Sequence, residues 1–222
     1  MHPTTLVLAS HNRKKLAELE AFFRALDCRL LLAADLASLP EPDETGGTFE
    51  ENAEIKAVAA ARGTGCWAIA DDSGLLVDAL GGAPGVRSAR FAGPNASDAD
   101  NRSRLLDVLR GVPTAERIAR FECRLAVSDP EGRVTLRAQG VCRGRILDAP
   151  RGSGGFGYDP LFLIPEYHRT FAELPAAVKS VLSHRARATE SLLTAWRRAP
   201  LLDRHSFTRA QGCDRARRSS DG

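Results

Sequence analysis

The hydrophobic positions at the start of the chain follow two different periods, which predict a strand, a helix and a second strand. Thr5–Ala9 and Arg29–Ala33 are short apolar runs of strand length. Between them, apolar residues recur at the three- to four-residue spacing of a helix face, from about Arg13 to Leu26. The polar run after Ala9 therefore lies at a strand-to-helix turn.

Three more helices and four more strands are predicted along the rest of the chain, one of the strands being the Ala68 run described below. Thr48-Phe-Glu-Glu51 is a capping box, and Ser183 has the side chain of an N-cap, so both mark helix starts. Asp129-Pro-Glu-Gly132 is a strong turn signal between two apolar runs and predicts a hairpin. The predicted helices are 48–62, 97–110 and 183–198, and the other predicted strands are 118–128, 133–141 and 161–164.

The run from Ala68 to Leu75 combines apolar and acidic residues. Small and apolar side chains stop abruptly at Asp71 and Asp72, which predicts a short buried strand that opens into a polar turn. The turn-rich segment Leu80–Val86 follows it. Acidic residues at a strand end beside a glycine-rich loop are typical of a Mg²⁺–phosphate site. The alternative is a capped turn, in which one aspartate bonds to its own backbone.

The strand-to-helix turn Ser10–Lys15 is a candidate phosphate site. Free backbone N–H groups and the helix dipole favour an anion at a helix start. Ser10 and Asn12 add donors, and Lys14 or Lys15 adds positive charge. The glycine-rich pattern of a Walker A loop is absent from this turn. The alternative is a well-capped surface helix.

An acidic loop and the helix that follows it form a second candidate. The loop 40–47 carries several carboxylates and ends at the predicted helix 48–62. Glu51, Asn52 and Lys56 lie near one another around that helix. An amide and a lysine on a helix made largely of alanine are compatible with a ligand site. A plain exposed face fits the same spacing.

The glycine-rich segment Gly152–Pro160 formally contains G-x-G-x-x-G. Pro160 prevents a helix from opening there, and a hairpin precedes it, so a dinucleotide-binding turn is excluded. A loop that presents Phe156, Tyr158 and Asp159 fits better, because an aromatic ring can stack on a base and a carboxylate can accept from a base edge. The alternative is an ordinary tight loop with Phe156 in the core.

Composition narrows the class of protein. The chain has 222 residues, of which 43% are hydrophobic, enough for one domain or two lobes with a real core. No apolar run approaches the ~20 residues that span a membrane. The five cysteines are scattered and make no C-x-x-C pair, which predicts reduced thiols in a cytosolic protein. From Pro200 onward the chain is basic and poor in apolar residues, which predicts a disordered tail.

Lysine is rare in a chain rich in arginine. The net charge is only +3, but of 31 basic residues four are lysines. A compact ammonium and a planar guanidinium are not interchangeable at a phosphate, so the positions that keep lysine are worth following. The lysines are Lys14, Lys15, Lys56 and Lys179.

Six motifs in this order resemble the inosine/xanthosine triphosphate pyrophosphatase family, over about Leu6 to Trp196. They are Ser10-x-Asn-x-x-Lys15, Thr48–Ala53 with Lys56, Ala70–Leu75, Gly81–Gly85, Gly154–Pro160 and Ser183-His-Arg185.

The resemblance implies a fold and a reaction. The implied fold is α/β, an elongated mixed β-sheet with flanking helices that form two lobes around a central cleft. The implied reaction hydrolyses ITP, dITP and XTP, noncanonical purine nucleoside triphosphates, to the monophosphate and pyrophosphate with Mg²⁺. A cytoplasmic homodimer with no membrane and no stable nucleic-acid partner is expected. The pyrophosphatase domain is expected to span 1–199, with the tail at 200–222.

The resemblance also assigns roles residue by residue. Asp72 takes the catalytic acid position and a metal position, with Asp43 or Glu44 as the other metal ligand. Asp43 stands where the family often has glutamate, so the choice between these two stays open. The remaining substrate-binding positions are Ser10, His11, Asn12, Arg13, Lys14, Lys15 and Lys56 for the phosphates, and Ser73, Phe156, Gly157, Tyr158, Asp159, Lys179, His184 and Arg185 around the nucleoside.

Two other functions stay open as alternatives. One is a Maf-type pyrophosphatase for modified nucleotides, against which Phe156–Asp159 and Ser183–Arg185 argue. The other is a non-catalytic module that binds nucleotides or nucleic acid, suggested by the arginine content and the basic tail. Release of pyrophosphate from ITP distinguishes an enzyme from a binder.

Overall fold

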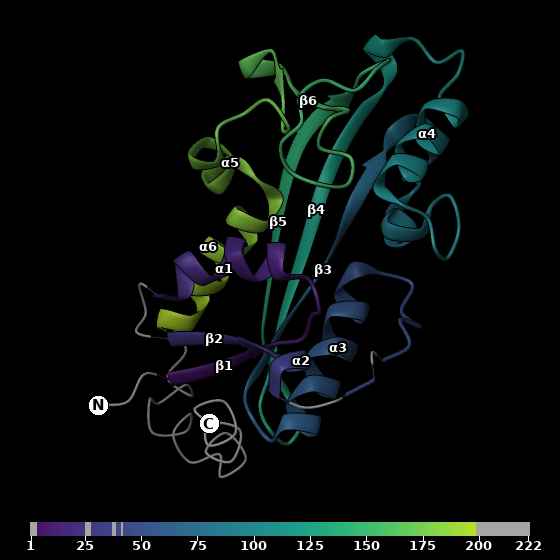
Figure 1. Ribbon diagram of the computed structural model, residues 1–222. Helices are drawn as coiled ribbons and strands as arrows, with labels where there is room; N and C mark the ends of the chain where they lie inside the picture. Colours follow the sequence, from purple (N-terminus) through teal and green to yellow (C-terminus); the bar gives the residue numbers. More distant parts are fainter. Residues whose placement is uncertain (1–3, 25–27, 37–38, 41, 199–222) are drawn as a thin grey trace. The chain divides into compact units, whose positions relative to one another are not determined.

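The protein is described by a computed structural model, which covers residues 4–24, 28–36, 39–40 and 42–198. Its described strands form one seven-stranded sheet in the order β2-β1-β3-β4-β5-β6-β7 (Figure 1). β1 pairs in parallel with β2 and β3, whereas β6 pairs antiparallel with β5 and β7, so the sheet is mixed as expected. The strands are β1 Thr4–Leu8, β2 Cys28–Leu32, β3 Ala68–Val77, β4 Ile118–Ser128, β5 Val134–Ile146, β6 Phe162–Ile164 and β7 Arg169–Thr170.

The helices begin where the sequence places capping residues. Thr48 and Glu51 form the predicted capping box of α3, and Ser97 forms another with Asp100 at α4. The Ser183 hydroxyl accepts from the backbone N–H of Ala186, as expected of an N-cap for α6. The described helices are α1 Arg13–Arg24, α2 Ala33–Leu36, α3 Phe49–Thr64, α4 Asp98–Val108, α5 Ala176–Leu182 and α6 His184–Arg198, with short 3₁₀ turns between them.

One prediction about the sheet is wrong. The strand that starts at Ala68 does not end at the aspartates but continues to Val77, so Asp71 and Asp72 lie in mid-strand. β3 lies between β1 and β4 in the sheet, and its pairing with β1 involves Ala68 and Ile69. Leu75 and Val77 are buried beyond the polar residues, so the apolar pattern resumes after them. The capped-turn alternative is therefore excluded.

The chain divides into two compact units, and β3, β4 and β5 contribute to both. Of the described residues, those within 4–72, 124–139 and 188–198 form the first unit, and those within 73–123 and 140–187 form the second. The expected cleft between two lobes stays a prediction. The proposed boundary at residue 199 also stays a prediction, because 199–222 lie outside the described residues.

Small side chains bring helix and sheet together in the first unit. Ala53 and Ala57 of α3 are fully buried and pack with Ala70 of β3 and Ala126 of β4. A second small cluster joins α3 to Val7 of β1. Alanine leaves little space between a helix and a sheet, so polar side chains on the same helix reach the strands.

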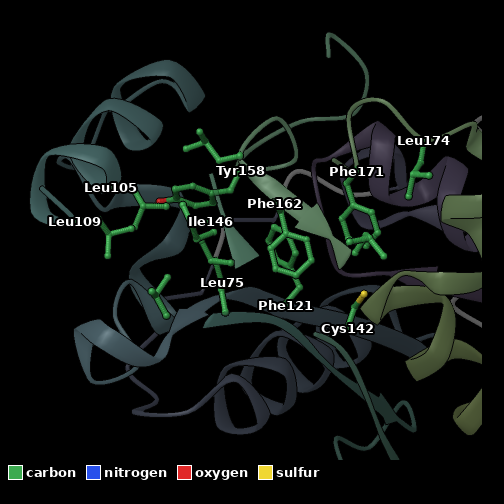
Figure 2. Packing of buried hydrophobic residues seen from close by; sticks show 14 residues of the cluster. Leu75, Leu105, Leu109, Phe121, Cys142, Ile146, Tyr158, Phe162, Phe171 and Leu174 are labelled. Atoms are coloured by element: carbon green, nitrogen blue, oxygen red, sulfur yellow. The ribbon is translucent and has the colours of Figure 1, made fainter. Parts of the chain in front are cut away.

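The core of the second unit is larger and partly aromatic (Figure 2). The ring centroid of Phe121 lies 4.6 Å from that of Phe162 and 6.0 Å from that of Phe171. Leu105 of α4 and Tyr158 of the glycine-rich loop belong to the same cluster. This core therefore ties α4 and the loop to the sheet.

Three of the cysteines are free and buried, as expected of reduced thiols in the core. Cys28, Cys123 and Cys142 are buried thiols, and burial raises the pKa of Cys142 to about 11. Across the described residues, every helix is too short or too polar to cross a membrane.

Candidate active site

In the turn between β1 and α1, polar side chains cap the start of the helix. The Ser10 hydroxyl accepts from the backbone N–H of Asn12 at 3.0 Å. The Asn12 amide oxygen accepts from the backbone N–H groups of Lys14 at 2.9 Å and Lys15 at 3.3 Å. The start of α1 is therefore a capped helix start, as the alternative prediction for this turn stated. It is compatible with anion binding, because the hydroxyl and the amide each keep a donor group.

Three of the basic residues in this turn are exposed. The Arg13 guanidinium lies 3.0 Å from Asp35 of α2, and both side chains are largely exposed. Lys14 and His11 are exposed. Lys15 is less exposed than these three and reaches Asp71 of β3.

Lys15 is fixed by Asp71. Its ammonium lies 2.6 Å from the Asp71 carboxylate, whose side chain is 0% exposed. Burying a carboxylate costs free energy unless a cation neutralises it. The Lys15 ammonium offsets that cost for Asp71, and the carboxylate in turn holds the ammonium in place. Asp71, whose role the sequence left open, therefore positions a lysine at the start of α1.

Lys56 of α3 holds two carboxylates. Its ammonium lies 2.6 Å from Asp72 and 3.2 Å from Glu44. Burial raises the pKa of Asp72, and the neighbouring ammonium only partly offsets that effect. Burial alone would lower the pKa of Lys56, but the attraction of Asp72 and Glu44 outweighs it and the pKa is raised. The lysine is therefore a firmly held cation.

The acidic loop is clamped by the start of α3. The Asn52 amide oxygen accepts from the backbone N–H of Gly46 at 2.9 Å, and the Glu51 carboxylate accepts from that of Gly47 at 2.7 Å. A Cβ at Gly46 would approach the Asn52 oxygen to 2.6 Å, so this position requires glycine. With the loop held so, Glu44 reaches Lys56 whereas Asp43 is exposed.

The donor set fits a hard divalent cation. Glu44 and Asp72 converge on the one ammonium of Lys56, so their oxygens already share a cation. Among the described residues, no three histidine, cysteine or acidic side chains gather as a complete metal cage. Mg²⁺ is usually bound by one or two carboxylates together with water and substrate phosphate. Two carboxylates are therefore a sufficient protein contribution.

A second group of predicted residues gathers in the other unit. The Lys179 ammonium lies 2.6 Å from the Asp159 carboxylate and 5.1 Å from the centre of the Phe156 ring. The guanidinium carbon of Arg185 lies 5.9 Å from the same centre. Asp159 also accepts from the backbone N–H of Phe156 at 3.1 Å. One aromatic ring is thus surrounded by two cations and a carboxylate.

Other predicted residues support this group. Arg185 donates to the Ser73 hydroxyl at 3.0 Å. The His184 ring is buried and stacks on Phe121, with centroids 4.8 Å apart. Tyr158 is also buried, and its hydroxyl donates to the carbonyl of Ser88 at 2.9 Å. We therefore interpret Tyr158 as an anchor of the loop and not as a base contact.

Sequence reasoning missed the residues that position these side chains. The role of Asp71 was open, and Asn52 was noted only for its place on a helix. Asn52 is fully buried, and its amide nitrogen has no hydrogen-bond partner within the described structure. In the sequence, the only sign of this clamp was an asparagine near the start of the helix that follows a pair of glycines.

Comparison with known proteins decides the family. The sequence model of the Ham1 family matches residues 6–195, which include both groups of side chains. The chain belongs to the Ham1 family. A relative from Geobacter sulfurreducens named dITP/XTP pyrophosphatase is 51% identical over 185 residues, which cover 83% of this chain and 92% of the relative. One of the same name from Gloeobacter violaceus is 49% identical over 206 residues, covering 90% and 98%.

Solved Ham1 structures have the same fold. The HAM1 protein from Coxiella burnetii superposes with a TM-score of 0.81 at 44% identity, covering 88% of this chain and 99% of that one. The Staphylococcus aureus Ham1 protein superposes with a TM-score of 0.78 at 39% identity, covering 87% and 98%. The mixed α/β fold implied by the six motifs is confirmed.

Proposed function

We propose that this protein hydrolyses noncanonical purine nucleoside triphosphates, ITP, dITP and XTP, to the nucleoside monophosphate and pyrophosphate. The observation that carries the proposal is the contact of Lys56 with both Asp72 and Glu44, in a family whose relatives are named dITP/XTP pyrophosphatases. A buried carboxylate held beside a lysine and a second carboxylate is suited to phosphate chemistry.

The first unit supplies the groups that bind phosphate. The start of α1 presents the positive end of its dipole, and the Ser10 hydroxyl and the Asn12 amide there each keep a donor group. Lys15 and Lys56 add two ammonium groups, each held by its own carboxylate. These charges stabilise the negative charge that develops on the leaving pyrophosphate.

Asp72 is proposed as the general base. It accepts a proton from a water molecule that attacks the α-phosphorus, and the bond to the bridging oxygen of pyrophosphate breaks. A raised pKa suits this role, because a base works best when its pKa approaches the working pH. Glu44 and Asp72 would hold Mg²⁺, which when bound neutralises phosphate charge and polarises the reacting phosphate. The contact of Glu44 with Lys56 favours Glu44 over Asp43 for this role.

The second unit supplies the groups that recognise the base. Phe156 offers a face for stacking, and Lys179 and Arg185 lie beside that ring as hydrogen-bond donors. A purine with an oxygen at position 6 can accept from such a donor. A 6-amino purine would leave the donor unpaired, which is costly in a desolvated site. Preference for ITP over ATP follows.

A nucleotide panel tests the proposal. Purified protein with Mg²⁺ should release pyrophosphate from ITP, dITP and XTP much faster than from ATP. No release from any of them would favour the non-catalytic nucleotide binder instead. Equal kcat/KM for ITP and ATP would contradict the arrangement of donors.

Two further properties are proposed from the family resemblance. The protein is expected to form a homodimer, which light scattering on the purified chain can test. A nucleotide-pool enzyme is expected in the cytoplasm, which cell fractionation can test.

A further inference from the structure

Both backbone polar groups of one residue in the glycine-rich loop, Gly157, are held by charged side chains of α4. The N–H of Gly157 donates to the Asp98 carboxylate at 2.7 Å. The carbonyl of Gly157 accepts from the Arg102 guanidinium, also at 2.7 Å. Asp98 and Arg102 are four residues apart on the helix, so they lie on one face of it.

The charges match the groups they hold. An anion faces the N–H and a cation faces the C=O, so each bond is charge-assisted and shorter than an ordinary N–H···O bond. Gly157 has φ +58°, in the left-handed region that favours glycine. The two contacts therefore fix a backbone conformation that other residues rarely adopt.

Gly157 lies between two aromatic residues with different surroundings. Tyr158 enters the hydrophobic core, where it belongs to the same cluster as Leu105 of α4 (Figure 2). Phe156, on the other side of Gly157, faces Lys179 and Arg185. The backbone conformation at Gly157, between its two flanking peptide units, thus determines where the Phe156 ring lies.

α4 is itself firmly supported. Its N-terminus carries the capping box of Ser97 and Asp100. The buried Asn101 amide accepts from the N–H of Ala92 at 2.8 Å and donates to the carbonyl of Ala89 at 3.0 Å. A helix held at its first turn is a suitable frame for positioning another loop.

We propose that Asp98 and Arg102 act as a peptide clamp on Gly157, which positions Phe156 and thereby sets the affinity and selectivity for the purine base. The proposal rests on the proposed function, because it assigns Phe156 to the base. Both clamp residues are positioning residues, since they act through the loop and not on the substrate.

Four variants test the clamp. Asp98→Ala and Arg102→Ala each remove one hydrogen bond, whereas Asp98→Asn keeps an acceptor and should recover much of the loss. Arg104→Ala removes an exposed arginine from the same helix and is the matched control.

Binding and kinetics separate the clamp from a general role in stability. Asp98→Ala and Arg102→Ala should weaken binding of inosine monophosphate by about threefold to tenfold, as expected for one partly exposed, charge-assisted hydrogen bond. KM for ITP should rise in parallel, with kcat and inhibition by inorganic pyrophosphate unchanged. Equal weakening of monophosphate and pyrophosphate binding, or monophosphate binding as tight as in Arg104→Ala, would overturn the proposal.

Amide hydrogen exchange tests the clamp without a nucleotide. The Gly157 amide should exchange faster in Asp98→Ala than in the wild type and Arg104→Ala. Unchanged exchange would overturn the clamp even if the enzyme is active. A wild-type protein that releases no pyrophosphate would overturn the proposed function instead, and the exchange result would still stand for the clamp.

Discussion

Asp71 and Asp72 are neighbours on β3, yet they hold two different lysines. Asp71 lies 2.6 Å from Lys15 of α1, and Asp72 lies 2.6 Å from Lys56 of α3. Successive side chains of a strand point to opposite faces, so helices on different sides can supply the two partners. The two aspartates therefore have different roles. Asp71 positions Lys15, whereas Asp72 lies beside the second acidic residue, Glu44.

Asp72→Asn should abolish most of the turnover while the nucleotide still binds. The amide keeps the shape of the carboxylate but cannot accept a proton, and a positioned general base contributes about 10²–10⁴-fold to the rate. Pyrophosphate release should fall by at least that factor, and calorimetry should still detect ITP binding.

Asp78→Asn is the matched control for this change. Asp78 follows β3 directly and pairs with Arg120 at 3.0 Å, with its side chain largely exposed. Its loss should leave kcat near the wild-type value. Near-normal turnover in Asp72→Asn would refute the assignment of the base.

Lys15→Met should destabilise the fold by about 3 kcal/mol, because it leaves the buried Asp71 carboxylate without its counter-charge. Asp71→Leu should cost less, since Lys15 is 19% exposed and its ammonium can turn towards water. The double variant should cost less than the sum of the two, because both charges are then gone. Urea unfolding of the four proteins measures this coupling, and strictly additive losses would contradict it.

Much of the fold follows from local pattern. The first strand, the first helix and the capping box at Thr48 are found within one or two residues of the predicted places, because apolar period and capping chemistry are local. β5 extends to Ile146, beyond the predicted end at 141, where neighbouring strands continue the pairing. The short elements α2, α5 and β7 were missed because each has too few residues to show a hydrophobic period.

The course of β3 shows what local pattern cannot give. Two aspartates, a serine and a glycine in succession predict a turn, but here they continue a strand. The lysines that neutralise Asp71 and Asp72 come from helices distant in the sequence. Only tertiary contacts make the strand possible, and they are not visible in a local window.

The sequence identified most side chains of the candidate site but not how they are oriented, because orientation also depends on tertiary contacts. The six motifs identified most of its side chains through the family resemblance. Phe156 and Tyr158 are both aromatic residues next to the same glycine, so the sequence does not distinguish them. In the structure, Tyr158 enters the core, whereas Phe156 faces the two cations described above. That difference depends on the backbone at Gly157, which is held by residues of α4.

Phe156→Leu should weaken binding of the base without affecting the phosphates. Leucine keeps an apolar side chain but removes the aromatic face, and stacking of a base on an aromatic ring is worth roughly 1–3 kcal/mol. KM for ITP should therefore rise by roughly 5- to 150-fold. Steady-state kinetics measures this, together with inhibition by pyrophosphate, which should not change.

Phe91→Leu is the control for the loss of an aromatic ring. Phe91 is partly buried against the core of the same unit and is assigned no contact with the base. It should lower stability while leaving KM near the wild-type value. A similar KM in Phe156→Leu and the wild type would remove Phe156 from the site.

Glu173→Gln should remove an acid-sensitive contribution to stability. The Glu173 carboxylate lies 2.8 Å from the Arg151 guanidinium and accepts from the backbone N–H of Thr170, also at 2.8 Å. The hydrogen bond from Arg151 and those from Thr170 lower the pKa of Glu173 from 4.5 to about 2. Since the pKa is lower in the folded protein, the unfolded chain binds more protons in this range, and stability falls as the pH falls.

The wild type should therefore be more stable than Glu173→Gln above about pH 5, and the difference should shrink as the pH falls from 4.5 towards 2. Thermal unfolding of both proteins between pH 2 and 7 measures it. Glu166→Gln, an exposed change just before β7, keeps the pair of Arg151 with Glu173 and serves as the control. A difference between the wild type and Glu173→Gln that is constant with pH would mean that the ion pair does not lower the pKa of Glu173.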